Sequence, residues 1–427
     1  MNYKRRVLAG KLRQMLERFA VVVISGARQV GKSTLLHHEL PEWETVVFDP
    51  ATDVGNARQD PDLFLDNHPA PLVLDEIQYA PELVAAIKRR VDRAVPPSRA
   101  GDATDRRSVG RRAGQYVLTG SQQWSVLKSA SESLAGRAVF LDLEGFCLAE
   151  IAQESTEDHW LKRYLEDPKG FLASPAKRLS CGRTVNEQLW RGFLPEADSL
   201  ELGWIAEFYR AYLRTYIERD VRLVTDVSDW QQFGRFVQLA AALTAQEINH
   251  AQLGRELGAT PQTARRWMAT LRATFQWFEA PAYHGNTIKR ISSKPKGYLA
   301  DTGLACSLQA VSSPRTLSGH PLAGALFETA VVGEIRKLAG TLATPPNLYH
   351  WRSNGGGEVD LLLERDGTFY PIEVKLASQP SRRDTRGIEA FRQTYPKLKI
   401  VQGLVVAPTE QVAKLSETEY CIPWDCQ

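Results

Sequence analysis

The chain has 427 residues, a net charge of +3 and ordinary shares of apolar and charged residues. This length exceeds what one ordinary hydrophobic core holds, so roughly two to four domains are expected. No run of about eighteen apolar residues occurs, which excludes a helical membrane span. The basic N-terminal segment predicts an amphipathic helix, because it lacks the apolar stretch and cleavage site of a signal peptide.

Two features of the composition bear on location and partners. The cysteines show no metal-binding or CxxC spacing, so we interpret them as reduced thiols of a cytoplasmic protein. The small net charge means that any preference for nucleic acid has to come from local basic patches. The five cysteines are Cys147, Cys181, Cys306, Cys421 and Cys426.

A phosphate-binding loop follows the first apolar strand. Residues 21–25 are rich in β-branched side chains and predict a buried parallel strand, and the next residues fit GxxxxGK[ST]. Glycines let backbone N–H groups approach phosphate oxygens, while Lys32 would reach the β- and γ-phosphates and Ser33 would hold Mg²⁺. The following helix would point its N-terminus at the phosphates. The residues predicted to bind ATP are Gly26, Ala27, Arg28, Gln29, Val30, Gly31, Lys32, Ser33 and Thr34.

Four further apolar segments predict strands, with helical stretches between several of them: residues 45–49, 71–76, 115–121 and 138–143. This alternation indicates an α/β domain with a parallel sheet in three layers. Asp75 ends the second of these strands, where a carboxylate associated with Mg²⁺ is expected. Glu76 beside it is placed to orient and deprotonate an attacking water. The alternative interpretation is a solvated strand end.

Two weaker signals complete the predicted nucleotide site. Ser121 ends the next strand and is predicted to sense the γ-phosphate. Arg137 precedes the last strand, where the AAA+ class of ATPases places an arginine finger directed at a neighbouring subunit. A surface or salt-bridged arginine is an equal alternative. The insertion at 96–114 lacks apolar periodicity, and a solvated loop is favoured there over a contact with nucleic acid.

The middle of the chain predicts helices and then a DNA-binding motif. Residues 147–230 have a helical pattern. A short helix that ends at Gly258 and a second that begins with Thr260 and Pro261 predict a helix-turn-helix. A β-wing is expected around residues 284–286.

Basic charge is concentrated in this motif. Residues 255–296 hold eight Lys or Arg against two Asp or Glu, a local balance of +6. Phosphate binding requires such a concentration. A packing module without DNA contact is the alternative. The predicted DNA contacts are Arg265, Arg266, Arg272, Lys289 and Arg290.

A charged hairpin lies near the C-terminus. Asp366-Gly367 is a dipeptide that favours a two-residue type I′ turn. Counting outward from this turn places Asp360 opposite Glu373, and strand alternation puts Lys375 on the same face as Glu373. Opposed carboxylates repel unless a cation lies between them. Asp with Glu-x-Lys is an arrangement that holds Mg²⁺ and activates water for phosphodiester cleavage.

Two further acids join this predicted face. Glu358 shares the face of Asp360 by alternation. Glu328 lies in an upstream apolar helix, where a carboxylate needs a partner or a metal ion. It is predicted as an additional ligand, directly or through water. A solvated hairpin is the alternative, and the catalytic competence of the site is left open.

The whole chain resembles the prokaryotic AAA+ ATPases that carry a C-terminal domain of unknown function with a restriction-endonuclease-like fold. The residues that carry the resemblance are GARQVGKST, LVLDEIQ, LTGSQ, SLAGRAVFLDLEGF, YIERDV, ALFETAVVGEI, YHWRSNGGGEVDLLLE and PIEVK. The resemblance implies ATP binding by the Lys32 loop. It also implies a PD-(D/E)xK site at Asp360, Glu373 and Lys375, with Glu328 as the helix acid. The insertion at 96–114 departs from the family pattern.

Four domains are therefore predicted: an AAA+ P-loop core (1–146), a helical lid or linker (147–230), a winged helix-turn-helix (231–305) and a PD-(D/E)xK nuclease-like domain (315–427). The leading hypothesis is a cytoplasmic, homo-oligomeric ATP hydrolase. It couples ATP and Mg²⁺ to DNA binding by the winged helix and to metal-dependent cleavage by the C-terminal domain. The alternatives are an ATP-dependent switch with an inert C-terminal site and a DNA-binding regulator.

Overall fold

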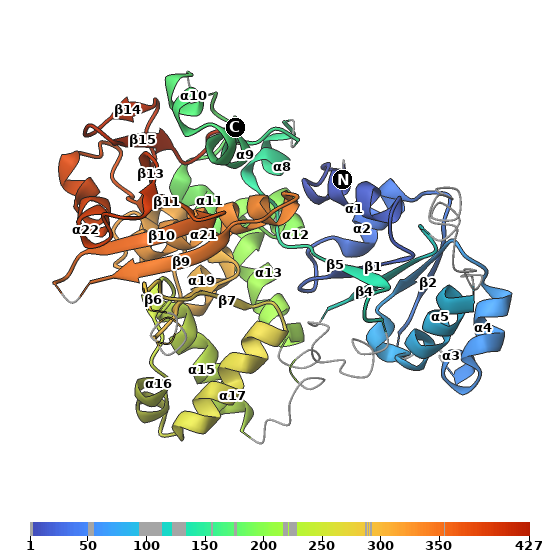
Figure 1. Cartoon of the computed structure of the whole chain (residues 1–427). Coiled ribbons are helices and arrows are strands. Elements are labelled where there is room, and N and C mark those ends of the chain that lie inside the picture. Colours follow the sequence, from blue (N-terminus) through green and yellow to red (C-terminus); the bar gives the residue numbers. More distant parts are fainter. Residues whose placement is uncertain are drawn as a thin grey trace. The chain divides into compact units, whose positions relative to one another are not determined.

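The computed structural model describes residues 3–49, 55–93, 113–121, 134–154, 157–174, 177–216, 221, 229–286, 288, 290, 293–353 and 355–427. Residues 96–112 of the insertion, most of the motif at 216–221 and the predicted DNA contact Lys289 lie outside the described residues. The chain divides into two units (Figure 1). The first comprises residues 1–145 with 273–275, and the second comprises 146–272 with 276–427.

The first unit is built on a five-stranded sheet whose strands pair in parallel. Its strand order is β2-β3-β4-β1-β5. The predicted strands are confirmed, because β1 and β4 are buried almost throughout and apolar residues cover both faces of the sheet. The strands are β1 (Val21–Ser25), β2 (Glu44–Val47), β3 (Leu72–Asp75), β4 (Tyr116–Gly120) and β5 (Ala138–Asp142).

Helices pack against this sheet. Alternate β1 residues such as Val21 and Val23 share one core with Leu83 and Ile87 of α5. The predicted N-terminal amphipathic helix is present as α1, which buries Leu8 and Leu12. The helical elements of the unit are α1 (Leu8–Leu16), α2 (Lys32–Glu39), α3 (Gly55–Gln59), α4 (Pro61–Asn67), the 3-10 turn η1 (Ile77–Tyr79) and α5 (Glu82–Arg93).

The second unit contains a mixed seven-stranded sheet in the order β14-β15-β13-β11-β10-β9, with β12 paired to β11. The pairs β9/β10 and β10/β11 are antiparallel, whereas β11/β13 and β13/β15 are parallel. The strands are β9 (Asn347–Arg352), β10 (Glu358–Arg365), β11 (Thr368–Val374), β12 (Lys399–Ile400), β13 (Gly403–Ala407), β14 (Ala413–Lys414) and β15 (Glu419–Pro423).

The hairpin between β10 and β11 has the predicted register. Arg365 pairs with Thr368, and the pairing runs outward to Leu361 and Ile372. Asp366 and Gly367 both have positive φ, 52° and 72°, as a type I′ turn requires. The turn therefore fixes which side chains of the two strands share a face.

Helices surround this sheet, and α22 packs Ile388 and Phe391 into an aromatic core under β10 and β11. The helical elements of the second unit are α8 (Leu148–Ala152), α9 (Trp160–Glu166), α10 (Pro168–Ala173), α11 (Val185–Arg191), α12 (Pro195–Ser199), α13 (Leu202–Thr215), α15 (Trp230–Ala242), α16 (His250–Leu257), α17 (Pro261–Ala273), α19 (Thr302–Leu308), α20 (Pro314–Leu317), α21 (Ala323–Thr341), η4 (Arg382–Thr385) and α22 (Arg386–Thr394).

The predicted pair of helices is present as α16 and α17. Gly258 ends α16 with a left-handed backbone (φ 65°), and the hydroxyl of Thr260 accepts a hydrogen bond from Thr263 N at 3.0 Å. A small antiparallel sheet of order β6-β8-β7 adjoins them. Its strands are β6 (Gln246–Glu247), β7 (Trp277–Ala280) and β8 (Lys296–Leu299).

The segment expected to form a wing contacts the C-terminal sheet. Tyr283 N donates to His350 O of β9 at 2.7 Å, and Ala282 forms a parallel bridge with His350. The Tyr283 ring lies among the rings of Phe369 and Phe391. Tyr283 therefore anchors the segment to the core of the C-terminal sheet. The periodicity of the sequence did not predict this contact.

The helices after residue 146 cluster with the C-terminal sheet in one unit. Tyr164 OH of α9 donates to Gln402 O at 2.6 Å, and Arg178 pairs with Asp425 at 2.7 Å. These contacts join residues that are more than two hundred positions apart. The finer division into four domains, with a lid at 147–230, stays a prediction.

His159 links α9 to α21 in a way that depends on its charge. Its Nδ1 accepts from Lys162 N at 3.2 Å at the start of α9, and its Nε2 lies 3.2 Å from Thr341 Oγ1. Nδ1 must therefore be unprotonated. Burial lowers the pKa of His159 from 6.5 to about 4, with the Lys162 charge acting in the same direction.

Replacing His159 with Asn is expected to weaken the pH dependence of stability. The unfolded chain takes up a proton near pH 6.5 and the folded chain only near pH 4. The contribution of neutral His159 to the free energy of unfolding is thus fully present above pH 6.5. It falls by up to roughly 3 kcal/mol as the pH falls towards 4. Asn keeps the cap without a titrating group. Urea midpoints at pH 7 and pH 5 measure this, and an equal drop in both proteins would contradict it.

Within the part of the chain that the structure describes, no helix is both long and apolar enough to cross a membrane.

Candidate functional site

The predicted phosphate loop connects β1 to α2. A Cβ atom on Gly26 would lie 2.0 Å from the carbonyl oxygen of Leu143, so only glycine fits there. Gln29 and Gly31 have positive φ, 61° and 91°, and Gly31 directly precedes α2. Lys32 is buried, and its Nζ donates to the carbonyls of Gly26 and Ala27 at 2.9 and 3.0 Å. The loop thus curls around its own ammonium group, which fits a site for phosphate oxygens.

The predicted magnesium residues meet across the sheet. Ser33 Oγ donates to Asp75 Oδ2 at 2.5 Å, and the hydroxyl of Thr119 donates to the other oxygen of Asp75. Strand β4, which carries Thr119, lies between β1 and β3. A hydroxyl beside a buried carboxylate next to the phosphate loop is the donor set that Mg²⁺ with ATP requires. Thr119 was not predicted, although it precedes Ser121 by two residues.

Glu76 and Ser121 are joined by one amide group. The side-chain amide of Gln78 donates to Glu76 Oε2 and, at 3.2 Å, to Ser121 Oγ. Glu76 itself has a left-handed backbone (φ 59°), and its N–H donates to Thr119 Oγ1 at 3.0 Å. One hydrogen bond therefore orients the Glu76 carboxylate, and another holds its backbone. Gln78 lies two residues after Glu76 and was missed, because its role depends on β4.

Arg6 is a second residue that the sequence did not reveal. Its guanidinium is buried and donates to Val30 O of the phosphate loop at 2.6 Å. It also donates to Glu144 O at 2.6 Å. The segment before α1 thereby connects the loop to the end of the sheet. A single arginine in a basic N-terminal stretch carries no signal for this role.

Arg137 is held within its own unit. Its Nε and Nη2 donate to the carboxylate of Asp92 at 2.5 and 3.1 Å. The Arg137 side chain is one-third exposed, so this pair contributes little to stability. In the structure Arg137 is a salt-bridged arginine, which was the alternative interpretation of this residue. A role as arginine finger towards a second subunit stays a prediction.

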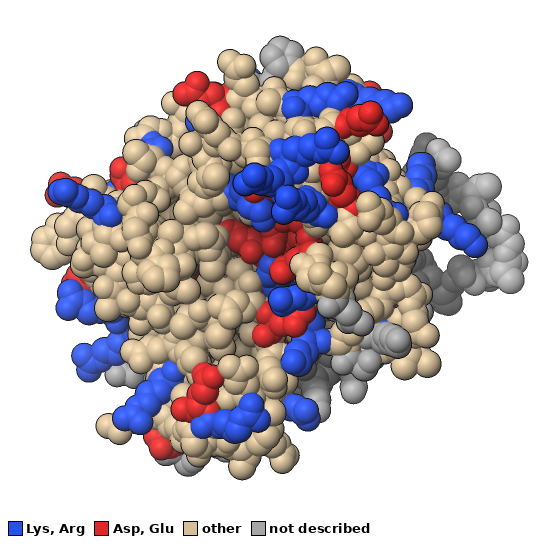
Figure 2. Space-filling model, turned by 90° about the vertical axis from the view of Figure 1, so that its left-hand side faces the viewer, with Lys and Arg blue, Asp and Glu red and all other residues tan. Residues whose placement is uncertain are grey.

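The acids predicted at the C-terminal site converge in the second unit. Asp360 and Glu373 are both buried, and Asp360 lies with Glu328 of α21 and Glu358 of β10 around one lysine. Lys375 Nζ lies 3.0 Å from Glu373 Oε2 and 3.5 Å from Asp360 Oδ2. Figure 2 shows one face of the molecule on which acidic side chains gather in a hollow with Lys and Arg side chains around it.

The cation among these carboxylates comes from the chain itself. Lys296 Nζ of β8 lies 2.7 Å from Glu328 Oε1 and 3.0 Å from both Glu358 Oε1 and Asp360 Oδ1. Its side chain is only 4% exposed. Lys296 belongs to the basic balance of residues 255–296, but in the structure these carboxylates neutralise its charge within the unit. Among the described residues, no three His, Cys, Asp or Glu side chains are arranged to hold a metal ion.

The electrostatics follow from burial and these pairs. Burial would raise the pKa of Asp360, but the ammonium groups of Lys296 and Lys375 outweigh it and bring that pKa to about 2. Burial and then the Asp360 charge raise the pKa of Glu328 to about 8 and that of Glu373 well above its usual range. Asp360 is therefore the anionic centre of the cluster.

The predicted DNA contacts fall into two groups. Arg265 and Arg266 are exposed on α17. Arg272 pairs with Glu279 at 2.7 Å. Arg290 donates to His284 O at 2.9 Å and lies over the ring of Tyr283, 4.7 Å from its centre. The last two arginines are thus engaged within the unit.

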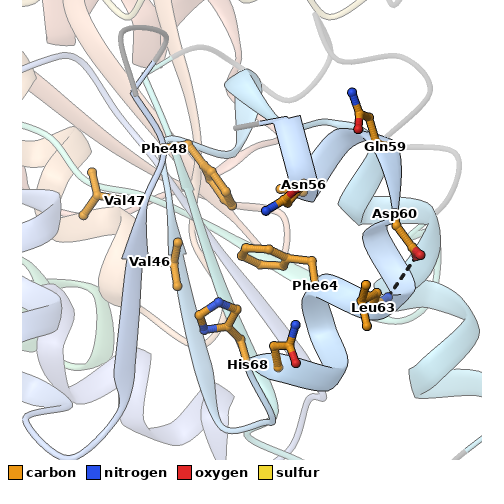
Figure 3. A pocket seen from close by; sticks show the side chains of 11 residues that line it. Val46, Val47, Phe48, Asn56, Gln59, Asp60, Leu63, Phe64 and His68 are labelled. Carbon is orange, nitrogen blue, oxygen red and sulfur yellow. Dashed lines mark hydrogen bonds between the residues drawn. The ribbon is translucent and has the colours of Figure 1, made fainter. Parts of the chain in front are cut away.

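A hollow of about 350 Å³ next to β2 contains none of the predicted residues (Figure 3). Its wall includes Phe48 and Phe64, whose rings lie 5.9 Å apart. Two of its polar groups have structural partners, since Asp60 accepts from Leu63 N at 3.0 Å and His68 Nδ1 lies 2.6 Å from Glu44. It is therefore a feature of the packing between β2 and α4.

Comparison with protein families gives three matches along the chain. Residues 18–152 match the family described as AAA domain. Residues 182–315 and 323–426 match two families described as domains of unknown function, DUF8612 and DUF4143. The first match and the phosphate-loop geometry agree, so residues 18–152 form an AAA-type domain with a P-loop. Such a domain implies ATP binding, typically with Mg²⁺.

Relatives extend over the whole chain. The uncharacterized proteins Mb2031c of Mycobacterium bovis and Rv2008c of Mycobacterium tuberculosis are each 28% identical over 426 residues, which cover 100% of this chain and 85% of each relative.

Among solved structures, the Walker-type ATPase PABY2304 of Pyrococcus abyssi is 15% identical with a TM-score of 0.37, over 70% of this chain and 94% of that one. Cdc6p of Pyrobaculum aerophilum is 12% identical with a TM-score of 0.22, over 65% of this chain and 87% of that one.

Proposed function

We propose that the protein hydrolyses ATP in its first unit and uses the nucleotide state to control DNA binding by its second unit. The observation that carries the first part is the contact of Ser33 Oγ with Asp75 Oδ2 beside the buried Lys32. Bound Mg²⁺ would neutralise charge on the β- and γ-phosphates. Ser33 and Asp75 would hold this ion, and Lys32 would release its two loop carbonyls to contact phosphate oxygens.

Glu76 is the proposed general base of this reaction. Its carboxylate is oriented through Gln78, which also contacts Ser121, so one amide group connects the base with the predicted γ-phosphate sensor. A base must lie within hydrogen-bond reach of the water that it deprotonates, and such orientation favours this. The loss of a γ-phosphate at Ser121 would thus be communicated to Glu76 through the same amide.

DNA binding is proposed for α16 and α17. The order α15, β6, α16, α17, β7, β8 supports a winged helix, in which the second helix of the pair would enter the major groove. Arg265 and Arg266 are exposed on that second helix, and Arg255 is exposed on the first. Exposed arginines on adjacent helices are suited to phosphate contacts.

Replacing both Arg265 and Arg266 with Ala is expected to weaken binding to duplex DNA for all sequences. Each lost phosphate contact lowers the slope of log affinity against log salt by about one, so a reduction of about two is expected. Arg210 and Arg214, exposed on α13, provide the matched double control. Fluorescence anisotropy at several salt concentrations, with ATP and without, measures the slope. An unchanged slope in the test variant would refute this interface.

A second activity, metal-dependent phosphodiester cleavage, is proposed because Asp360 and Glu373 lie beside Lys375, and Glu328 shares the partner Lys296 with Asp360. The order α21, β9, β10, β11, α22, β13 supports a restriction-endonuclease-like fold. The experiment incubates plasmid DNA with Mn²⁺ or Mg²⁺, with ATP and without. Nicking that disappears in Asp360→Ala and Glu373→Ala supports cleavage. ATP-sensitive DNA binding without nicking supports a regulator, and neither activity supports a switch between protein states.

A further inference from the structure

Lys296 occupies the centre of the C-terminal carboxylate cluster. An ammonium group has three N–H donors, and Nζ of Lys296 has three carboxylate partners, from Glu328, Glu358 and Asp360. The three oxygens come from α21 and β10, whereas the lysine comes from β8. All three donors are thus matched by acceptors, and the cluster is complete as an ammonium site.

As packed, these oxygens surround Lys296 Nζ and do not form a metal site, so a divalent cation would have to take the place of the ammonium group. Carboxylate oxygens are ligands for Mg²⁺ and Mn²⁺, and Mg²⁺ binds them at about 2.0–2.1 Å, shorter than the 2.7–3.0 Å seen to Nζ. An ion bound by Asp360 Oδ1 and Glu328 Oε1 would compete with the ammonium group for these two oxygens, because both already contact Nζ. The second oxygen of Asp360 is also engaged, by Val374 N at 3.0 Å.

We propose that Lys296 and a divalent cation compete for one position, so that the C-terminal site accepts a metal ion only when Lys296 is withdrawn. The proposal rests on the metal-dependent function proposed above and names the residue that controls it. The charges permit both states, because four carboxyl groups face two lysines. Exchange of Lys296 for a divalent ion changes the net charge by one.

The lysine is positioned by the small sheet that follows the helix-turn-helix. A Cβ atom on Gly297, the next residue, would lie 2.1 Å from the Trp277 ring of β7 and 2.8 Å from Ile248. Strand β8 therefore fits tightly between its neighbours. Withdrawal of Lys296 would involve its long side chain or the β6-β8-β7 sheet as a body, which joins the metal site to the proposed DNA-binding helices.

The test measures Mn²⁺ binding without nucleotide or DNA, by electron paramagnetic resonance of free Mn²⁺. Lys296→Gln and Lys296→Ala are compared with the wild type and with Lys294→Ala, which removes an exposed lysine two residues away. The Lys296 variants are expected to bind one more Mn²⁺ per chain, at least about tenfold more tightly than the wild type. Adding Asp360→Ala should abolish the gain. Equal affinity in wild type and folded Lys296→Gln would overturn the proposal.

A second measurement uses the wild type and does not depend on the variants folding. Acetic anhydride labels accessible lysines, and mass spectrometry compares Lys296 with exposed Lys294 as internal reference. Mn²⁺ is expected to raise labelling of Lys296 and to leave Lys294 unchanged. Mn²⁺ that binds through Asp360 with no rise at Lys296 would overturn competition.

Failure of this inference differs from failure of the cleavage proposal. If Lys296→Gln binds additional Mn²⁺ but does not nick DNA, the competition between Lys296 and the metal ion is supported and the cleavage proposal is refuted. If the wild type binds Mn²⁺ and nicks DNA while Lys296 stays protected from labelling, the competition is refuted and the cleavage proposal is supported.

Discussion

Replacing Glu76 with Gln is expected to lower the ATP hydrolysis rate at least about 100-fold, because general-base catalysis contributes roughly 10²–10⁴. ATP affinity should stay within a few-fold of the wild type, since Lys32, Ser33 and Asp75 remain. Gln also keeps an oxygen that can accept from the Gln78 amide. Phosphate release measures turnover, and a fluorescent ATP analogue measures binding.

Two controls make this result specific to Glu76. Glu44→Gln changes an exposed acid of the edge strand β2 and is expected to leave turnover unaltered. Gln78→Ala removes the amide that orients Glu76 and contacts Ser121, so a smaller loss in turnover than for Glu76→Gln is expected. Wild-type turnover in Glu76→Gln would show that another residue deprotonates the water.

Lys296→Ala is expected to destabilise the second unit by about 3–5 kcal/mol in the absence of metal. Removing one partner of a buried ion pair leaves uncompensated buried charge, and the cost is of this size. Asp360 and Glu328 are 9% and 13% exposed and lose their closest cation. Hydrogen exchange of amides in β8 and β10 measures the change locally, because a chain of two units need not unfold in one step.

A double variant isolates the electrostatic cause. Adding Asp360→Asn to Lys296→Ala removes the anionic carboxylate together with the lysine charge, so part of the lost stability should return. Lys294→Ala should alter exchange by less than about 0.5 kcal/mol, as is usual for an exposed site. If Lys296→Ala exchanged like Lys294→Ala, the lysine would contribute no net stability.

The two sites differ in how their residues reach one another. In the first unit, Ser33 and Asp75 are brought together by parallel strands whose carboxyl ends meet at one edge. In the second unit, α21, β8, β10 and β11 each supply a charged side chain. The first arrangement follows from a short sequence motif and the parallel strands next to it. The second forms only when several distant segments of the chain pack together.

The sequence by itself determined the local elements. The strand, loop and helix around Lys32 are adjacent in the chain, so glycine spacing and apolar pattern predict them directly. The turn at Asp366-Gly367 sets the register of β10 and β11, and alternation then places Asp360 and Glu373 together. The cap of α17 at Thr260 and the end of α16 at Gly258 are likewise encoded within a few residues.

Only the tertiary structure decided which charges are neutralised, and by what. Lys296 lies 64 positions from Asp360, and Arg290 and Arg137 contact groups that no periodic pattern connects to them. A basic side chain has the same sequence signature on a DNA-binding surface and inside a carboxylate cluster. The outcome depends on desolvation and on which acids the packed strands present, and both arise from contacts between distant segments.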